Sequence, residues 1–204
     1  MLILYTRLGS CGLASHIALE EAGAAYEFRQ LDFTQQAQRS PDYLALNPKG
    51  RVPALVTDHG VLTETTAILA YVAQAFPAAK LAPTEAFEFA QLQAFNGYLA
   101  STVHVAHAHR HRGYRWADDP AAHEAMRAKV ASNMTECFTL IEEEMLAGPW
   151  VLGGAYSVCD PYLFTIAGWL EGDGVDVKQF PKVSAHMAAM AKRPAVRKVL
   201  AALA

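Results

Sequence analysis

The pattern of apolar residues changes once along this chain, close to residue 80, and that change limits the folds it can adopt. Before it, short apolar runs alternate with helical periodicity. The predicted strands are residues 2–5, 26–31, 54–57 and 61–63. One predicted helix ends at Gly23 and a second spans residues 64–75. The order, βαβ followed by ββα, is typical of a small α/β sandwich.

After the change only helical patterns remain. The predicted helices are residues 87–111, 121–146, 158–170, 182–192 and 195–203. Residues 77–85 contain two prolines and no periodicity, as a linker would. We therefore expect an α/β N-terminal domain over residues 1–76, a linker over 77–85 and an all-α C-terminal domain over 86–204.

Composition excludes several classes of protein. The 204 residues are 52% hydrophobic and 18% charged, which is incompatible with intrinsic disorder. With 17 basic and 20 acidic side chains the formal net charge is -3, so we expect no nucleic-acid partner. No apolar run approaches the roughly 20 residues that span a bilayer, so we expect a soluble chain with no membrane partner.

Three cysteines, Cys11, Cys137 and Cys159, lie far apart in the sequence. An odd number without paired spacing predicts neither a zinc site nor a disulfide framework. A reducing, cytoplasmic location fits this pattern best. Any thiol chemistry would then be that of a single cysteine.

Three stretches of the chain carry recognisable motifs: residues 47–55 (NPKGRVPAL), 62–68 (LTETTAI) and 9–19 (GSCGLASHIAL). The first two resemble the glutathione-binding segment of the cytosolic glutathione S-transferase family, and the third is similar to the start of its bacterial beta class. The likeness continues through SVCD at 157–160 and RPAVR at 193–197. The resemblance implies a thioredoxin-like N-terminal domain, an all-helical C-terminal domain, a homodimer, and glutathione as cosubstrate.

The resemblance assigns four residues to glutathione. Val52, before a cis Pro53, would pair through its backbone with the cysteinyl unit, and an X-Pro bond adopts cis at modest cost. Glu64 would meet the ammonium of the γ-glutamyl group. Thr65, at a helix start with free N–H groups, would hold its carboxylate. The basic residue that pairs with the glycyl carboxylate in the family is replaced by Gln36 or a neighbour.

The thiol end of the site leaves two mechanisms open. Cys11 stands at the first turn of a helix, where backbone donors can lower a thiol pKa into the neutral range. Because position 14 is Ala14, no Cys-x-x-Cys pair exists, and redox chemistry would run through a monothiol cycle with glutathione. Ser10 could instead donate a hydrogen bond to the glutathione sulfur, or serve only as a helix cap. The beta class often has serine where this chain has Gly12.

His104 aligns with the active-site histidine that the resemblance implies, and we expect it to line the cleft. The family's following lysine is Val105 here, and its asparagine one turn earlier falls on Gly97. Asn96 is adjacent, but a residue on an α-helix is rotated by about 100° from its neighbour, so it would not substitute simply.

His104, His107 and His111 have the i, i+3, i+7 spacing of one helical face, which is compatible with a metal site. No carboxylate or cysteine joins them in the local sequence, and cationic groups are favoured at a helix C-terminus, so we expect no metal. Tyr114 and Trp116 could form part of an apolar substrate cleft, but aromatic side chains of a helical domain are more often in the core, so neither is nominated.

Two further features of the C-terminal half are interpreted as structural. Ser157 and Asp160 have the spacing of a capping box. Trp169 and Cys159 are expected in the core.

The predicted activity is conjugation of glutathione thiolate to electrophilic, largely apolar substrates. One alternative is glutathione-dependent thiol–disulfide exchange through Cys11. Because a fold does not determine a function, a non-catalytic glutathione-binding protein of the same fold is a second alternative.

Overall fold

Four strands form one mixed sheet in the N-terminal part of the chain. The computed structural model describes residues 1–7 and 9–202. The strands are β1 (Leu2–Thr6), β2 (Tyr26–Gln30), β3 (Ala54–Thr57) and β4 (Gly60–Thr63), in the order β2-β1-β3-β4. β1 is parallel to β2 and antiparallel to β3, which is antiparallel to β4. The thioredoxin-like topology predicted from the sequence is confirmed.

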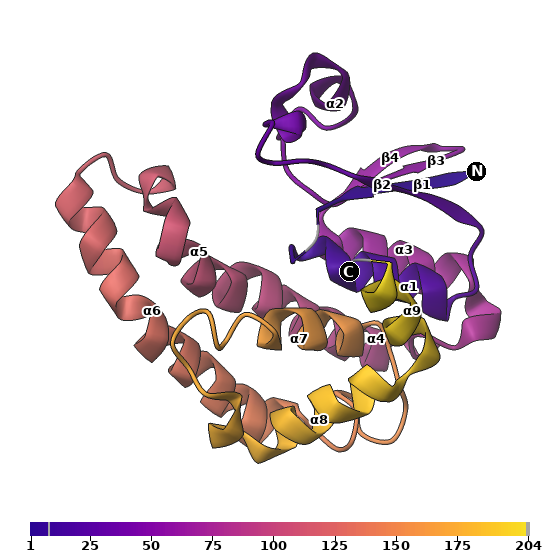
Figure 1. Cartoon of the computed structure of the whole chain (residues 1–204). Coiled ribbons are helices and arrows are strands. Elements are labelled where there is room, and N and C mark those ends of the chain that lie inside the picture. Colours follow the sequence, from indigo (N-terminus) through magenta and orange to yellow (C-terminus); the bar gives the residue numbers. More distant parts are fainter. Residues whose placement is uncertain (8, 203–204) are drawn as a thin grey trace.

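Helices cover both faces of this sheet. Figure 1 shows α1 (Gly12–Glu21) and α3 (Thr65–Ala75) on the face toward the rest of the molecule, and α2 (Pro41–Leu46) on the other face. α2 was not predicted, because six residues are too few for a helical period to emerge. Its start does carry a local signal, since Ser40 Oγ accepts a hydrogen bond from Tyr43 N–H and Pro41 occupies the first turn.

The other regular elements of the described chain are helical, apart from an isolated bridge between Trp150 and Gly153. The helical elements are α4 (Ala86–Tyr98), η3 (Leu99–Val103), α5 (His104–Arg112), α6 (Pro120–Leu140), η5 (Ile141–Met145), α7 (Cys159–Ala167), α8 (Pro181–Lys192) and α9 (Pro194–Ala201). Short 3-10 turns are η1 (Ala37–Arg39), η2 (Pro77–Ala79), η4 (Gly113–Arg115) and η6 (Val177–Gln179). Residue 203, the last of a predicted helix, lies outside the described residues.

The long predicted helix over residues 87–111 contains a π-helical segment, η3, between α4 and α5. A π-helix bonds residue i to i+5 and so accommodates one extra residue per turn. The expectation that Asn96 would not substitute simply for the family's asparagine assumed a regular α-helix from residue 87 to His104. The π-helical segment η3 changes the rotation between Asn96 and His104, so this assumption does not hold. Asn96 is fully buried, and neither of its side-chain polar atoms has a hydrogen-bond partner among the residues that the structure describes.

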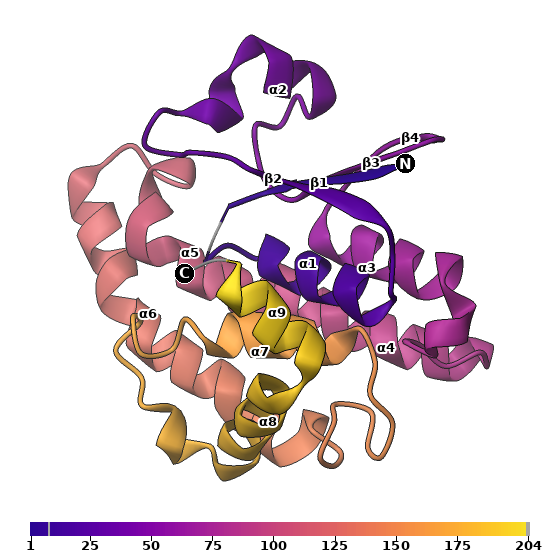
Figure 2. The same cartoon turned by 45° about the vertical axis from the view of Figure 1, so that its right-hand side comes forward.

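One continuous hydrophobic core joins the sheet layer to the helical layer. It runs from Leu4 on β1 through Ile68 on α3 to Leu163 on α7. Figure 2 shows α7 enclosed by other helices, and all but one of its residues are buried. The predicted linker is also anchored, because Leu81 is buried and its carbonyl accepts a hydrogen bond from Val158 N–H.

Asp160 forms the predicted capping interaction at the start of α7. Its Oδ2 accepts from Ser157 N–H at 2.7 Å, and its Oδ1 accepts from Val151 N–H at 2.8 Å. His186 Nε2 on α8 lies 3.0 Å from Oδ1. The local signature predicted the cap, while the contacts to Val151 and His186 depend on tertiary packing.

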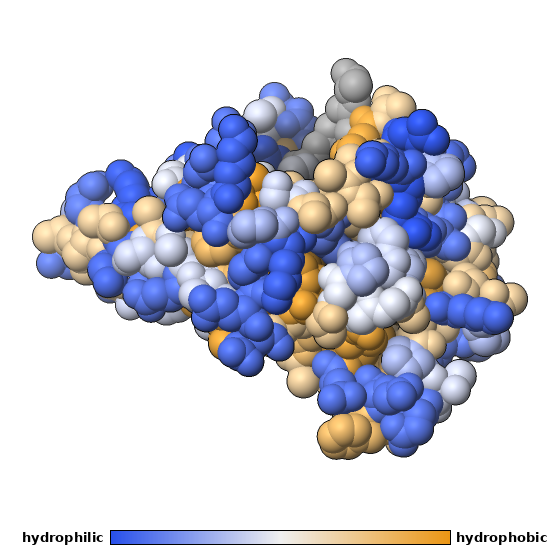
Figure 3. All heavy atoms as spheres, turned by 90° about the horizontal axis from the view of Figure 1, so that it is seen from below, coloured by the Kyte–Doolittle hydropathy of each residue, from blue (hydrophilic) through white to orange (hydrophobic). Residues whose placement is uncertain are grey.

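The surface of the helical part is mixed. Figure 3 shows hydrophilic residues over much of this face, with smaller hydrophobic patches between them. Across the described residues, every helix is too short or too polar to span a bilayer.

Candidate functional site

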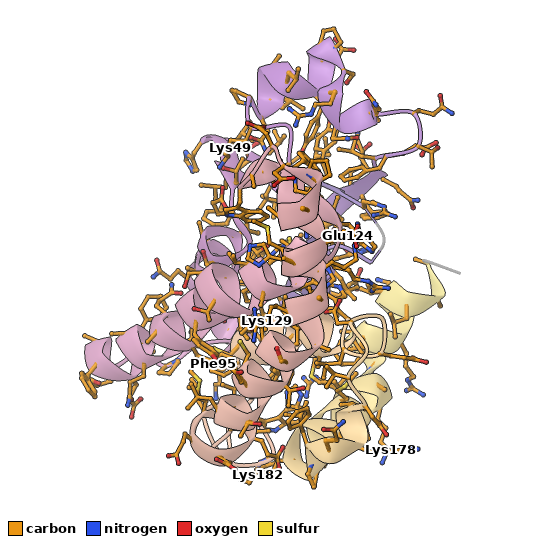
Figure 4. The ribbon with its side chains drawn as sticks, turned by 90° about the vertical axis from the view of Figure 1, so that its left-hand side faces the viewer. Lys49, Phe95, Glu124, Lys129, Lys178 and Lys182 are labelled. Carbon is orange, nitrogen blue, oxygen red and sulfur yellow. The ribbon has the colours of Figure 1, made fainter. Side chains whose placement is uncertain are left out.

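A cleft of about 780 Å³ lies between the N-terminal unit and α5. All the residues that the sequence nominated line it: Ser10, Cys11, Val52, Pro53, Glu64, Thr65 and His104. Their numbers span more than ninety positions, so folding brings together four separate segments. In Figure 4 the loop residue Lys49 is seen on the N-terminal unit and Glu124 on α6 of the helical unit.

The loop before β3 presents free backbone groups to the cleft. The Val52–Pro53 peptide bond is cis, as the resemblance implied. The preceding carbonyl, of Arg51, accepts hydrogen bonds from Tyr43 Oη at 2.6 Å and Asn47 Nδ2 at 2.7 Å, and both donors are buried. No acceptor among the described residues takes the Val52 N–H, so it remains available to an extended peptide.

Glu64 and Thr65 stand where β4 passes into α3. Glu64 has φ of 72°, a conformation that is costly for a residue with a side chain and is often retained at functional sites. Its carboxylate pairs with the Lys49 ammonium, which also donates to Thr63 Oγ1 at 2.6 Å. Thr65 is buried at the first turn of α3, where backbone N–H groups lack helical partners. The segment thus offers a carboxylate and a helix N-terminus side by side.

Cys11 lies at the start of α1 but lacks the environment of a thiolate. Its side chain is buried, and Sγ donates to the Val52 carbonyl at 3.6 Å. Burial raises the pKa of this thiol above its ordinary value, and the Thr65 hydroxyl and the Arg112 charge oppose that only in part. The helix start therefore does not bring the pKa of Cys11 into the neutral range, because desolvation outweighs the Thr65 hydrogen bond and the Arg112 charge.

Ser10 forms the hydrogen bonds of a structural cap. Its hydroxyl donates to the Arg7 carbonyl at 2.7 Å and accepts from Gly12 N–H at 3.3 Å. Thr6 Oγ1 is 3.0 Å from the same oxygen. Gly12, the departure from the beta-class pattern, has a steric reason, since a Cβ there would lie 1.8 Å from Thr6 Oγ1. A hydroxyl can rotate to another acceptor, so capping does not remove Ser10 from the site.

His104 faces Arg112, two turns later on the same helix. Arg112 Nη2 lies 3.4 Å from His104 Nε2. Burial, followed by the charge of Arg112, lowers the pKa of His104 to about 3. His104 is therefore a neutral imidazole that accepts from a guanidinium. Val105 lines the cleft where the resemblance implies a lysine.

His107 belongs to a second polar group on the same wall. Its Nδ1 lies 2.7 Å from Oδ2 of the buried Asp173, and its ring stacks on Trp169 with centroids 4.2 Å apart. Arg110 Nη1 is 3.5 Å from the other Asp173 oxygen. Two of the three histidines that were considered for a metal site thus have other partners, Asp173 for His107 and Arg112 for His104.

Aromatic and cationic residues complete the cleft, and the sequence did not nominate them. Tyr114, Trp116 and Trp169 all line it. Tyr114 and Trp116 are 62% and 46% exposed, so they belong to the cleft and not to the core, whereas Trp169 is partly buried and also packs against the core. Arg112 carried a usable signal, because a residue eight positions after His104 lies close to the same helical face. The remaining cations and Tyr162 had no such signal; they are Arg7, Arg39, Arg51 and Arg115.

Family comparison agrees with this geometry. The family model of the glutathione S-transferase N-terminal domain matches residues 1–74, and that of the C-terminal domain matches residues 66–194. The chain belongs to the glutathione S-transferase family.

Individual relatives refine the placement. The chain is 30% identical to glutathione S-transferase GstA of Escherichia coli O157:H7 over 202 residues, covering 98% of this chain and 97% of the relative. A glutathione transferase homolog from Sulfitobacter, solved with bound glutathione, superposes with a TM-score of 0.96 at 46% identity, over 99% of this chain and 98% of the other. A bacterial beta class enzyme from Sphingomonas chungbukensis gives 0.85 at 33% identity, over 98% of each chain. The predicted likeness to the beta class is confirmed.

Proposed function

We propose that this chain is a glutathione S-transferase that conjugates glutathione thiolate to electrophilic, largely apolar substrates. The observation that carries the proposal is the convergence, in one cleft, of the Val52 backbone, the start of α3 and the start of α1. The Sulfitobacter homolog, solved with bound glutathione, supports it. In this proposal residues 1–76 form the glutathione-binding domain, with 77–85 as the linker to the helical domain over 86–204.

Each part of glutathione has a matching group. Its cysteinyl backbone would pair with Val52 beside Pro53, where the N–H is free. Its ammonium would displace Lys49 from Glu64, and its γ-glutamyl carboxylate would meet Thr65 and the N-terminus of α3. Its sulfur would lie near Ser10 and Cys11 at the start of α1, where a hydrogen bond and the helix dipole favour the thiolate.

Conjugation is better supported than thiol–disulfide exchange. Exchange needs an accessible Cys11 thiolate. The Cys11 thiol is buried and its pKa is raised, so the free enzyme holds it as a thiol at neutral pH. Conjugation, in which the glutathione sulfur attacks the substrate, does not require a Cys11 thiolate.

Turnover of chlorodinitrobenzene tests the proposal. We expect retention on immobilised glutathione followed by turnover in solution. Ser10→Ala should lower kcat/KM by roughly tenfold to a hundredfold, the value of one hydrogen bond to a charged acceptor. Cys11→Ala should keep most of the activity. Ser132→Ala, which removes an exposed hydroxyl on α6, is the matched control.

Other outcomes separate the alternatives. Loss of activity in Cys11→Ala, with Ser10→Ala active, favours the covalent route. Retention without turnover favours a glutathione-binding protein that has no catalytic activity. Absence of retention contradicts all three.

A homodimer and a cytoplasmic location belong to this proposal as well. The homodimer follows from the family resemblance, and the location follows from the cysteine pattern, which is typical of a reducing compartment. Light scattering on the purified chain tests the first, because a dimer has twice the 22.2 kDa of one chain.

A further inference from the structure

The cleft carries a strong excess of positive charge. Among the described residues that line it are five arginines and a single acidic residue, Glu64. The chain as a whole has a formal net charge of -3, so this excess is local. None of the five guanidiniums forms an ion pair with a described residue. Such a cleft attracts anions and raises their local concentration.

Arg112 is the most buried of these five arginines. It is partly buried, and its described side-chain hydrogen bond is the 3.4 Å contact with the neutral His104. Partly buried arginines elsewhere have carboxylate partners, since Arg110 meets Asp173 and Arg193 forms two hydrogen bonds with Glu21. Burial and the neighbouring charge of Arg115 lower the pKa of Arg112. A partly buried guanidinium without a carboxylate partner is stabilised when an anion binds to it. Its planar N–H groups can donate two parallel hydrogen bonds to a carboxylate.

Glutathione does not account for all of this charge. In the proposed pose its γ-glutamyl carboxylate lies at α3, and its glycyl carboxylate would lie near Gln36, on the same N-terminal unit as Arg39 and Arg51. Arg112 and Arg115 come from the opposite wall, at the end of α5 and in η4. Tyr114 and Trp116 expose apolar rings beside them. That wall therefore combines an apolar surface with unpaired cations.

We propose that Arg112 binds a carboxylate on the electrophilic cosubstrate, so that preferred substrates combine an apolar body with an anionic group. The inference rests on the proposed transferase function and deepens it. Arg115 adds to the attraction from a more exposed position, and Trp116 and Tyr114 face the apolar body.

A pair of substrates that differ in one charge tests the proposal. Chloronitrobenzoate and its methyl ester undergo the same reaction, in which the glutathione sulfur bonds to the ring carbon, chloride leaves with the electron pair of the C–Cl bond, and the thiol proton passes to solvent. The ester group activates the ring more than the carboxylate does, so each kcat/KM is divided by the uncatalysed rate constant of that substrate with glutathione. We expect this normalised wild-type kcat/KM for the acid to exceed that for the ester by at least about tenfold, equivalent to about 1.4 kcal/mol. The preference should shrink as ionic strength rises.

Variants then assign the preference to Arg112. In Arg112→Gln the normalised ratio of acid to ester should fall to within about twofold of unity, and Arg112→Lys, which keeps the charge without the planar guanidinium, should give an intermediate ratio. Arg197→Gln makes the same charge change at an exposed position on α9 outside the cleft and should keep the wild-type ratio. Circular dichroism confirms that each variant is folded.

Binding of the two glutathione conjugates, measured by calorimetry, gives a readout that does not need catalysis. Tighter binding of the acid conjugate to wild type, lost in Arg112→Gln, supports the proposal. If both conjugates bind equally well, the role proposed for Arg112 is wrong and the transferase function is unaffected. If neither conjugate binds, both the proposed function and this inference are wrong. If Arg112 serves only the glutathione thiolate, Arg112→Gln raises the pKa of bound glutathione and slows acid and ester alike; an unchanged ratio then overturns the proposal.

Discussion

The indole N–H of Trp169 donates a hydrogen bond to the carbonyl of Gly9 at 3.1 Å, although the two residues are 160 positions apart. Gly9 directly precedes Ser10 and Cys11, and Trp169 follows α7 in the helical part. The same indole stacks on His107. A buried helix of the C-terminal half thereby positions the segment that begins α1.

Removing that donor should loosen the site without unfolding the protein. In Trp169→Phe the ring still packs, but the Gly9 carbonyl loses its partner, and we expect the free energy of unfolding to fall by about 1 kcal/mol. Urea titration followed by circular dichroism measures it, and glutathione KM should rise. Trp116→Phe, an exposed ring, is the control. Equal values for wild type and Trp169→Phe would show that the hydrogen bond contributes nothing.

Asp160→Asn should be the most destabilising of these changes. The buried carboxylate accepts from Val151 N–H, Ser157 N–H and His186, and an amide NH2 group would face donors. Breaking a buried network of this kind costs about 3 to 5 kcal/mol. Asp176→Asn, at the start of η6, removes a carboxylate that caps an exposed turn and should cost about 1 kcal/mol or less. Denaturant midpoints of the two variants give the comparison.

His16 should make stability depend on pH. It is buried, with its ring stacked on Phe28 at 4.4 Å, and burial lowers its pKa to about 4. Because the folded pKa lies below the unfolded value of about 6.5, the unfolded chain takes up the proton first. The stabilisation is complete above about pH 6.5 and is lost as pH falls toward 4.

The variant His16→Phe isolates this effect by keeping a stacked ring that does not titrate. Between pH 7 and pH 4.5 wild type should lose about 2 kcal/mol more of its free energy of unfolding than His16→Phe. Urea unfolding at several pH values measures the difference. Parallel losses in both proteins would mean that His16 titrates normally.

Cys11 should react slowly with iodoacetamide at neutral pH. Its pKa is raised by burial, so the thiolate that reacts is scarce until pH exceeds the ordinary thiol value of about 9. Mass spectrometry of the Cys11 peptide should show an alkylation rate that keeps rising through pH 9.5. An alkylation rate that levels off near pH 7 would show that the pKa of the Cys11 thiol is lowered and not raised.

Much of the fold was predictable because its signals are local. Periodicity distinguished the strands of the first half from the helices of the second, and SVCD predicted the cap that Asp160 forms. The short helix α2 was not predicted, because six residues are too few to show helical periodicity. The π-helical segment η3 was not predicted, because its composition does not differ from that of the helices around it.

The sequence by itself determined which short segments line the cleft, since a proline loop, a helix start and a cysteine turn are each encoded by neighbouring residues. The tertiary structure alone decided the electrostatics of the cleft. The burial that raises the pKa of Cys11, the burial that lowers the pKa of His104, and the gathering in one cleft of five arginines that form no ion pair with a described residue all depend on how separate segments pack together. Desolvation and Coulomb interactions act through space, so they are settled only when those segments pack together.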